Sequence, residues 1–329
     1  MFKNIDKKKI LAFRDKLVKI QHSFFQKYGV NDIFSNSKVY EVLVANQLNH
    51  ELIKGHSGSR DARNENGEFE YKHYKESSSN HTWTFNDFSD TTIEKLKSAH
   101  AVIFAHIDDT SSIPILDWYY EIPGPVMSEY LAQKTLSIKN KRKMVNISRS
   151  QLESLGFKPI KISSINKTGP YYKELLEIFE TIKQMEKESG TQGLLTSNKI
   201  FELLTAAELG HNVNSEQGGR EGCHDAFDKE GRKFEYKISK NLSWNFQDIS
   251  DNVLNKYVKN DDMIYLAIKD PLGLEILKIY SATPKAVVAL LKKKLKEKKA
   301  RKKVLRRLQV SLSAGDLKKI KAICEYERD

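Results

Sequence analysis

Two stretches of this sequence decide how the chain is organised: residues 38–50 read KVYEVLVANQLNH, and residues 199–211 read KIFELLTAAELGH. The offset that aligns these two stretches also places WTFNDFSD, residues 83–90, beside WNFQDISD, residues 244–251. Such matches extend over nearly the whole chain of 329 residues. The sequence therefore predicts two tandem domains and not a solenoid of short repeats.

The join between the repeats is expected where Gly, Pro and Ser replace apolar periodicity. Residues 154–170, SLGFKPIKISSINKTGP, have that composition. We therefore expect a first domain at residues 1–153, a linker at 154–170 and a second domain at 171–329. A buried strand is expected in each domain, at VIFAH (102–106) and at MIYLA (263–267), which the same offset aligns.

Each repeat shows the same succession of local patterns. An amphipathic helix is followed by an apolar helix, two strands joined by a turn, a strand with Trp, a capped helix, a buried strand, a further strand and a basic helix. The predicted fold class is mixed α/β. The opening helices are expected at residues 6–27 and 171–188, the apolar helices at 37–49 and 198–209, and helix N-caps at Ser37, Ser197, Ser89 and Ser250.

The charge of the chain favours a polyanionic partner. Lys and Arg number 55 against 43 Asp and Glu, which gives a net charge of +12. A basic excess of this size is typical of proteins that bind nucleic acid. Hydrophobic residues make up 39% of the chain, enough for packed cores and too many for a disordered protein.

Composition also narrows the cellular setting. The sequence has no run of about 20 apolar residues that could form a membrane span. The N-terminus, MFKNIDKKKILAFRDK, lacks the apolar core of an export signal, so a cytoplasmic location is expected. The only cysteines, Cys223 and Cys324, argue against a disulfide framework or a cysteine-based zinc site.

The residues best suited to chemistry lie between the apolar helix and the Trp strand. Residues 61–72 read DARNENGEFEYK, and residues 225–237 read DAFDKEGRKFEYK. In a strand, residues i and i+2 share a face, so Glu70 and Lys72 should point the same way, and a glycine turn should bring Asp61 next to Glu70. The candidate catalytic residues are Asp61, Glu70, Lys72, Asp225, Glu235 and Lys237.

Two carboxylates that converge beside one lysine form a hard-oxygen site of the kind that Mg²⁺ prefers. The metal can polarise a phosphodiester and lower the pKa of a bound water. The lysine can orient that water and offset charge that develops on the phosphate. The alternative is a solvated hairpin whose Glu and Lys pair across its face, but recurrence of the pattern in both repeats of a basic chain favours a Mg²⁺-dependent nuclease.

The hairpin resembles the PD-(D/E)XK nuclease motif, and more narrowly that of the PvuII-type restriction endonucleases. The second repeat is the closer match, with Gly219-Arg220-Glu221-Gly222 leading to Asp225-Ala226 and then Glu235-x-Lys237. Residues 29–34, GVNDIF, resemble the entry to the catalytic helix of that family. The resemblance implies a central mixed β-sheet flanked by helices in each repeat. It also implies Mg²⁺-dependent cleavage of double-stranded DNA by two catalytic units.

The sequence departs from that family in three ways. Neither catalytic aspartate follows a proline, because Arg60 and His224 stand there. The spacing from Asp to Glu is nine residues in the first repeat and ten in the second. The His-rich recognition stretch of the PvuII type is missing, which predicts a different target sequence.

Glu41 and Glu202 occupy equivalent positions on the two apolar helices. By the same resemblance, a helix glutamate lies near the metal, where it orients water or binds a second ion. The alternative is an ion pair with Lys38 or Lys199, three residues earlier on the helix. We therefore place Glu41 and Glu202 beside the metal ligands Asp61, Glu70, Asp225 and Glu235 as additional candidates.

A further group of residues is assigned to DNA contact. The two tryptophans could stack on bases, although a Trp in a strand is commonly core. Amide side chains in the same strands can form paired hydrogen bonds with adenine. Basic residues, including a run at 292–307 with eleven Lys or Arg, can contact phosphates. The DNA-binding candidates are Trp83, Thr84, Asn86, Trp244, Asn245, Gln247, Lys141, Arg142, Lys143, Arg220, Lys299, Arg301 and Lys302.

Together these features predict a single-chain pseudo-dimer of the type II restriction kind that cuts both strands of double-stranded DNA with Mg²⁺. One chain would suffice, so a monomer is expected, and the resemblance implies a cognate DNA methyltransferase as the partner in the system. Two alternatives stay open. One is a structure-selective nuclease, such as a junction resolvase or repair enzyme, and the other is a DNA-binding protein with one or both sites inactive.

Overall fold

The two repeats fold into the same succession of helices and strands. The computed structural model describes residues 5–54, 60–111, 113–138, 143–213, 224–301 and 308–328, without the side chains of Asp87 and Arg301. The first repeat consists of α1 (Lys7–Tyr28), α2 (Val39–Leu48), β1 (Glu51–Leu52), β2 (Ala62–Asn64), β3 (Gly67–Lys75), β4 (Trp83–Phe88), α3 (Asp90–Lys95), the 3₁₀ helix η1 (Leu96–Ser98), β5 (Ala101–Asp108), β6 (Ile115–Pro123), α4 (Gly124–Lys134), β7 (Lys143–Ile147), α5 (Arg149–Ser154) and β8 (Ile160–Lys161).

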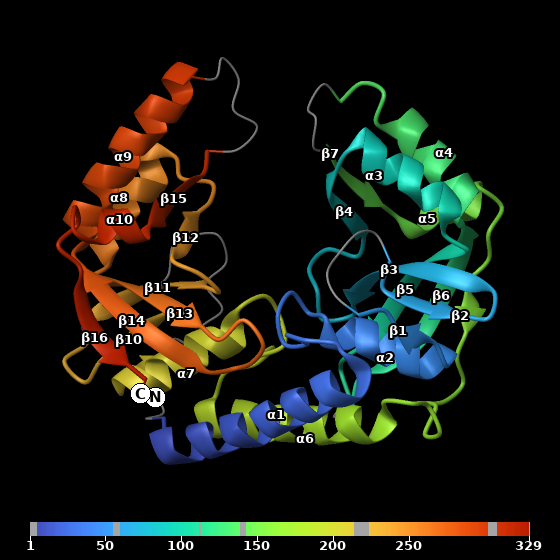
Figure 1. The fold of residues 1–329 in the computed structure, drawn as a ribbon, viewed down its shortest axis with the longest axis horizontal. Helices are drawn as coiled ribbons and strands as arrows, with labels where there is room; N and C mark the ends of the chain where they lie inside the picture. The colour runs from blue at the N-terminus through green and yellow to red at the C-terminus, as the bar shows by residue number, and fades with distance from the viewer. Residues whose placement is uncertain are drawn as a thin grey trace. The chain divides into compact units, whose positions relative to one another are not determined.

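The second repeat follows in the same order, as the colours of Figure 1 allow the reader to trace. It consists of α6 (Tyr172–Ser189), α7 (Lys199–Leu209), β9 (Asn212–Val213), β10 (Ala226–Phe227), β11 (Lys233–Ser239), β12 (Ser243–Phe246), α8 (Asp251–Asn260), β13 (Met263–Lys269), β14 (Ile276–Ala282), α9 (Pro284–Arg301), β15 (Val310–Ser313), α10 (Ala314–Leu317) and β16 (Ile323–Glu327).

Each repeat builds one six-stranded mixed sheet. The strand orders are β1-β2-β3-β5-β6-β8 and β9-β10-β11-β13-β14-β16, so the two sheets have the same topology. Only β3 with β5 and β11 with β13 run parallel, while the other neighbours are antiparallel. A separate two-stranded ribbon, β4–β7 or β12–β15, completes each repeat. The prediction of a mixed α/β fold is confirmed.

The chain divides into two compact units whose limits differ from those of the repeats. The N-unit, Ser23–Ile33 and Ser37–Glu180, holds β1–β8, and the C-unit, Met1–His22, Phe34–Asn36 and Thr181–Asp329, holds β9–β16. Helices α1 and α6 each contribute one part to either unit. The opening helices are therefore shared between the two units.

Specific contacts attach each part of α1 to its unit. In the C-unit, the Arg14 guanidinium forms an ion pair of 2.7 Å with Glu208 of α7. In the N-unit, Lys27 pairs with Glu174 of α6 at 2.8 Å, and the ring centroids of Phe24 and Tyr171 lie 5.5 Å apart. These contacts hold helices from both repeats within each compact unit.

The segment at residues 154–170, expected to be a linker, is packed within the N-unit. Strand β8 pairs with β6 at the edge of the sheet. The Asn46 side chain donates to the carbonyl oxygen of Asn166 at 3.0 Å and accepts from the backbone N–H of Tyr171 at 3.0 Å. These bonds attach the end of the segment to α2.

The N-caps of the two apolar helices differ from the prediction. Ser37 and Ser197 have left-handed backbones, with φ of 62° and 54°, and lie one residue before the caps. Lys38 and Asn198 are the N-cap residues, and neither makes a side-chain capping bond. The prediction fails because a backbone turn precedes each helix, so the Ser37 carbonyl, for example, accepts the backbone N–H of Tyr40.

The helices after the Trp strands begin as predicted. The Ser89 hydroxyl accepts the backbone N–H of Thr92 at 3.2 Å at the start of α3. The Ser250 hydroxyl accepts that of Val253 at 3.3 Å at the start of α8. A serine in this position satisfies one of the free N–H groups of the first turn, which explains where both helices start.

Both tryptophans are core residues. Trp83 and Trp244 are fully buried, and their indole N–H groups donate to the carbonyls of Ala105 and Ala267, each at 2.8 Å. The acceptor lies 22 residues after Trp83 but 23 residues after Trp244. The predicted match between the buried strands is therefore wrong by one residue, because the second repeat has one extra residue between its capped helix and the buried strand.

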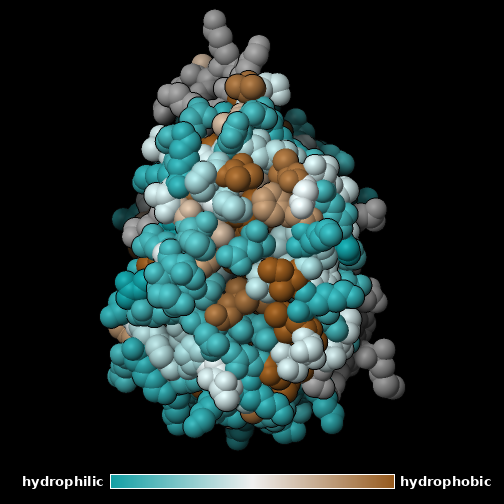
Figure 2. All heavy atoms as spheres, turned by 90° about the vertical axis from the view of Figure 1, so that its right-hand side faces the viewer, coloured by the Kyte–Doolittle hydropathy of each residue, from teal (hydrophilic) through white to brown (hydrophobic). Residues whose placement is uncertain are grey.

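The surface shown in Figure 2 is largely hydrophilic, with groups of apolar side chains among the polar ones. Exposed apolar residues of the N-unit include Leu136, which has 83% of its surface exposed, and Met144, which has 49% of its surface exposed. No helix in the described part of the chain is long and apolar enough to cross a membrane.

Candidate active site

The hairpin of β2 and β3 brings the predicted residues of the first repeat together. The backbone N–H of Asp61 donates to the Phe69 carbonyl at 2.8 Å, and Asp61 Oδ2 accepts the backbone N–H of Tyr71 at 2.7 Å. Because Tyr71 lies between Glu70 and Lys72, this second bond places the Asp61 carboxylate against the middle of the Glu-Tyr-Lys triplet. We call Glu41, Asp61, Glu70 and Lys72 the N-site.

Lys72 is held inside the N-site by charge and by aromatic rings. Its Nζ donates to Glu70 Oε1 at 2.5 Å and to the Tyr71 carbonyl at 3.0 Å. The ammonium also lies 5.2 Å from the ring centroid of Phe85, a distance suited to a cation–π interaction. Glu70 is only 5% exposed, so this ion pair lies largely out of water.

The C-site, formed by Glu202, Asp225, Glu235 and Lys237, repeats this arrangement. Asp225 Oδ2 accepts the backbone N–H of Tyr236 at 2.7 Å. Lys237 Nζ is ion-paired with Glu235, and it lies 5.7 Å from the ring centroid of Phe246, which corresponds to Phe85. The structure thus gathers all six predicted catalytic residues into two equivalent clusters.

The difference in hairpin length is absorbed in the turn. Strand β10 ends at Phe227, and the longer turn is held by Asp228, whose Oδ1 accepts the backbone N–H groups of Glu230 at 3.0 Å and Arg232 at 2.9 Å. Gly231 supplies the positive φ, 78°, that this turn requires. The longer spacing therefore leaves the Asp–Glu–Lys arrangement unchanged.

The helix glutamates approach the same clusters. Burial raises the pKa of Glu41 to about 7, opposed chiefly by the positive charge of Lys72. Burial likewise raises the pKa of Glu202, opposed by Lys237. The charge of Lys38 also lowers the pKa of Glu41, but less than that of Lys72 does. Both glutamates therefore interact electrostatically with the hairpin residues.

The aspartates lie in a strongly anionic environment. Burial, followed by the charges of Glu41 and Glu70, raises the pKa of Asp61 well above its ordinary value. Burial and the charges of Glu235 and Glu202 do the same to the pKa of Asp225. Such shifts arise where carboxylates crowd together with too little positive charge to balance them.

The charge balance of each cluster fits a divalent cation. Three carboxylates face one ammonium in each site, and buried charges in proteins are paired or coordinate metals. Carboxylate oxygens are also the ligands that Mg²⁺ prefers. Among the described residues, no three His, Cys, Asp or Glu side chains are already gathered at ligand positions around one point. Side chains of each cluster would have to move to complete a coordination shell.

A histidine–tyrosine contact at each site was missed by the sequence analysis. His50 Nδ1 lies 2.7 Å from the Tyr71 hydroxyl, and His211 Nδ1 lies 2.8 Å from that of Tyr236. Burial lowers the pKa of each histidine to about 4, so both imidazoles are neutral near pH 7, and which group of each pair donates depends on the tautomer of the ring. The contact ties the end of the apolar helix to the catalytic strand. The sequence contains a signal for this contact, because His50 and His211 are the last residues of the two aligned stretches 38–50 and 199–211.

The C-site contains two further polar residues that sequence analysis did not single out. Lys237 Nζ lies 5.8 Å from the ring centroid of Tyr257, on α8. Asp261 follows the end of α8, and burial together with the charge of Glu235 raises its pKa to about 7. Both side chains therefore act electrostatically on the Glu235–Lys237 pair.

The proposed stacking of Trp83 and Trp244 on DNA bases is incompatible with their positions. Both indoles are fully buried, with their N–H groups bonded to the neighbouring strand, so neither ring has a face open to a base. The polar residues that follow them in the chain are on the surface. Asn86, Asn245 and Gln247 are exposed.

The outer faces of the small ribbons pair polar side chains across strands. The Thr84 hydroxyl donates to the Asn146 amide oxygen at 2.9 Å in the β4–β7 ribbon. In the β12–β15 ribbon, the Ser311 hydroxyl lies 3.5 Å from the Asn245 amide oxygen. Asn146 and Ser311 therefore extend the predicted polar surface, and only the pairing of strands that are distant in the sequence reveals them.

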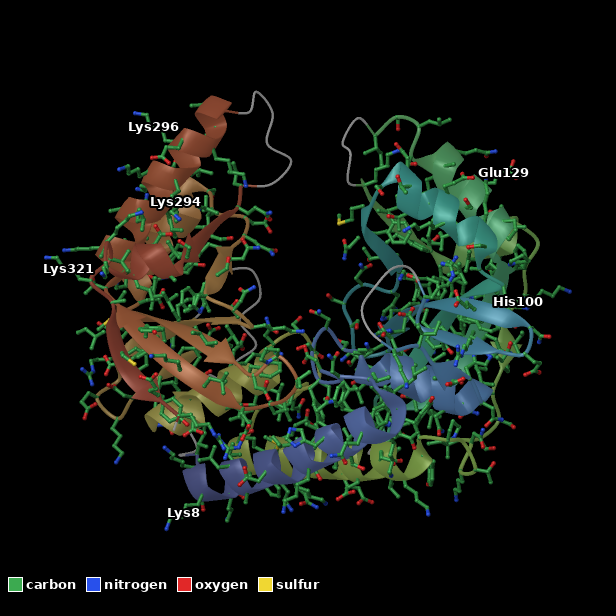
Figure 3. All side chains as sticks on the ribbon, viewed as in Figure 1. Lys8, His100, Glu129, Lys294, Lys296 and Lys321 are labelled. Atoms are coloured by element: carbon green, nitrogen blue, oxygen red, sulfur yellow. The ribbon has the colours of Figure 1, made fainter. Side chains whose placement is uncertain are left out.

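The basic candidates divide into three groups. Lys143 is 8% exposed and bonded to Asp90 Oδ1 at 2.5 Å, so its ammonium serves the fold and is not available to phosphate. Lys299 is exposed on α9, and Figure 3 shows Lys296 of the same helix extending away from the ribbon. The remaining candidates, Lys141, Arg142, Arg220 and Lys302, as well as the side chain of Arg301 and Cys223, lie outside the described residues.

Comparisons with known proteins assign no family to the chain. No family model matches the sequence. No curated protein is similar enough to count as a relative.

Proposed function

We propose that this chain is a Mg²⁺-dependent DNA endonuclease of the type II restriction kind, with two PD-(D/E)XK-like catalytic sites in one pseudo-dimeric polypeptide. The observation that carries the proposal is the double occurrence of one cluster. An aspartate, a hairpin glutamate and a lysine lie together at the same place beside both six-stranded sheets, and a buried helix glutamate acts electrostatically on each group. The surrounding sequences have diverged, so a role for these four residues explains the repetition better than shared packing alone.

In this proposal, Asp61 with Glu70, and Asp225 with Glu235, hold Mg²⁺, and Glu41 and Glu202 complete the anionic environment. The bound ion supplies Lewis-acid polarisation of the phosphodiester and activation of water. The carboxylates contribute by balancing their excess negative charge against the cation, which fixes it beside the hairpin. The bonds from the backbone N–H groups of Tyr71 and Tyr236 orient the aspartates for this task.

The lysines act as positive charges and not as bases. Burial by itself would lower the pKa of Lys72, but the charges of Glu70, Asp61 and Glu41 outweigh it and raise the pKa. The pKa of Lys237 is raised for the same reason. A lysine that stays protonated can hydrogen-bond water and stabilise negative charge on the phosphate as the bond to the leaving oxygen breaks.

DNA contact rests on the net charge of +12 and on exposed polar groups. Exposed lysines of α9 would contact phosphates and set the register of the protein on the duplex. The amides of Asn86, Asn245 and Gln247 have the donor and acceptor pattern that reads adenine in the major groove. Because the two ribbons present different residues, the two half-sites of the target need not be identical.

The proposal is tested by incubating the purified chain with supercoiled plasmid and with a mixture of linear DNA, in Mg²⁺ and in EDTA. Discrete fragments that form only with Mg²⁺ are the expected result, and sequencing their ends gives the target and the overhang. Preferential cleavage of a four-way junction over linear duplex would favour a structure-selective nuclease. Binding without cleavage of any unmodified DNA would reject the proposed activity in favour of a binding protein.

A further inference from the structure

The two sites differ where the helix before the central strand ends. Tyr257 lies seven residues after the N-cap Ser250, as Leu96 does after Ser89. Leu96 of the N-unit is fully buried and belongs to its hydrophobic core. The phenol of Tyr257 instead lies beside the C-site lysine.

Backbone bonds identify the counterpart of Asp261. The backbone N–H of Asp262 donates to the Lys233 carbonyl at 2.8 Å, two residues before the catalytic Glu235. The backbone N–H of His100 makes the same 2.8 Å bond to Glu68, two residues before Glu70. The residues that precede these donors therefore correspond, so Asp261 stands where the N-unit has Ala99.

Ala99 is part of a tightly packed junction. It is 4% exposed, and a Cβ built on Gly124, the first residue of α4, would meet its carbonyl oxygen at 2.3 Å and its Cβ at 2.9 Å. At this position the N-unit therefore has apolar packing and backbone. In contrast, the C-site has a carboxylate there, and its Oδ1 is buried with no hydrogen-bond partner in the described structure.

A buried carboxylate oxygen without a partner is costly unless a cation balances it. The charged groups that act on Asp261 are Glu235, Lys237, Asp262 and Lys233. Lys237 is already bonded to Glu235, and the exposed ammonium of Lys233 is the weakest of the four charged influences on Asp261. Asp261 thus adds to the C-site a carboxylate without a counterpart in the N-site, and no lysine or arginine is bonded to it among the described residues.

We propose that Asp261 is a positioning residue that makes the two sites unequal, so that the C-site binds divalent cations more tightly than the N-site. This inference rests on the proposed function, because it assumes that both clusters bind metal. When Mg²⁺ is limiting, the C-site is occupied first, and one defined strand is nicked before the other.

The test measures binding of Mn²⁺ alone to the full chain by isothermal titration calorimetry, without DNA. Two classes of sites are expected, and Asp261→Asn should weaken the tighter class by about tenfold or more, because loss of a nearby opposite charge has effects of that order. Asp262→Asn is the matched control, since it removes the same charge from the exposed neighbouring residue. It should change neither class by more than about twofold.

A second readout follows strand order on a duplex labelled differently on each strand. At limiting Mg²⁺ the wild type should nick one strand first, and Asp261→Asn should reduce that bias while both strands are still cut at saturating Mg²⁺. Circular dichroism and thermal melting would verify that the isosteric variant is folded, and Asp261→Ala would serve if it is not.

The outcomes separate this inference from the proposed function. Unchanged Mn²⁺ affinities in Asp261→Asn, with normal cleavage by the wild type, would overturn the inference alone. Lower thermal stability with unchanged Mn²⁺ affinities would also overturn it, because Asp261 would then serve only the fold. Absence of both Mn²⁺ binding and Mg²⁺-dependent cleavage in the wild type would reject the proposed function and the inference together.

Discussion

The N-site and the C-site have the same backbone framework, but different residues stand at equivalent positions beside it. In both, an aspartate accepts the backbone N–H that lies between a glutamate and a lysine, and the lysine bonds that glutamate. Beyond this framework, Tyr257 and Asp261 act on the C-site lysine and glutamate, whereas buried apolar Leu96 and Ala99 stand at the corresponding positions of the N-unit. The Asp–Glu–Lys arrangement common to both sites supports the chemistry that we propose. The residues that differ beside it can alter the properties of each site separately.

The turns around the two sites differ in length, whereas the histidine–tyrosine contacts beside them are alike. The extra hairpin residue of the C-unit is confined to the turn held by Asp228 and leaves the catalytic strand in register with its neighbour. The His50–Tyr71 and His211–Tyr236 contacts have nearly the same length, 2.7 Å and 2.8 Å. A duplicated site can therefore tolerate change in its loops while the contacts that orient its strand persist.

The largest effect is expected from removing both lysines. The double variant Lys72→Ala/Lys237→Ala should lose Mg²⁺-dependent cleavage by about 10³-fold or more, because each site then lacks its positive charge for the phosphate. Plasmid cleavage under single-turnover conditions is the measurement. Lys8→Ala, on the exposed surface of α1, is the control and should cut at nearly the wild-type rate.

Large losses of stability are expected from changes to the two core tryptophans. Trp83→Ala and Trp244→Ala should each cost about 3–5 kcal/mol in the unit concerned, because each removes a fully buried ring and a bonded indole N–H. Urea denaturation followed by hydrogen exchange would resolve the two units. Asn86→Ala should leave the free energy of unfolding within about 0.5 kcal/mol of the wild type. Equal destabilisation by Asn86→Ala would contradict the division into core and surface.

A moderate effect of pH is expected without metal. The pKa of Glu41 is about 7 in the folded chain, against an ordinary value of 4.5, and a raised carboxyl pKa stabilises the folded state most at low pH. Stability should therefore fall as pH rises from about 4.5 to 7, and Glu41→Gln should flatten that fall. Mg²⁺ should restore stability above pH 7 by binding the ionised cluster. Thermal melting over this pH range, with and without Mg²⁺, is the measurement, and stability that rises with pH in the metal-free protein would contradict the expected role of Glu41.

The smallest effects are expected on the basic helix. Lys296→Ala and Lys299→Ala should weaken DNA binding slightly and equally for all sequences, and each should lower the salt slope by about 1 if that lysine contacts a phosphate. Fluorescence anisotropy at several salt concentrations gives the slope. An unchanged slope in both variants would show that this face of α9 lies away from DNA.

Much of the fold was predictable because it depends on local patterns that occur twice. The hairpin, the caps at Ser89 and Ser250 and the order of elements follow from turn residues and from apolar periodicity. The match between β5 and β13 was wrong by one residue because both strands are uniformly apolar, so the sequence fits either register equally well. The bond from each tryptophan to its carbonyl and the pairing of each strand with the catalytic strand fix the register.

The parts of the site that sequence analysis missed depend on contacts between distant segments. Asn146 and Ser311 join the polar surface through ribbon pairing. Asp261 was overlooked because the register error aligned it with His100 instead of Ala99. A carboxylate that aligns with an exposed histidine is ordinary surface variation. A carboxylate that replaces a buried alanine, close to a catalytic glutamate, instead indicates a role in the site.

The most direct test of the two-site account is strand-specific cleavage by the single variants Lys72→Ala and Lys237→Ala on a duplex that contains the target, with each strand labelled separately. The account predicts that each variant nicks one strand, that the two variants nick opposite strands, and that a mixture of the two restores double-strand cleavage only slowly. Full double-strand cleavage by either single variant, or nicking of the same strand by both, would contradict it.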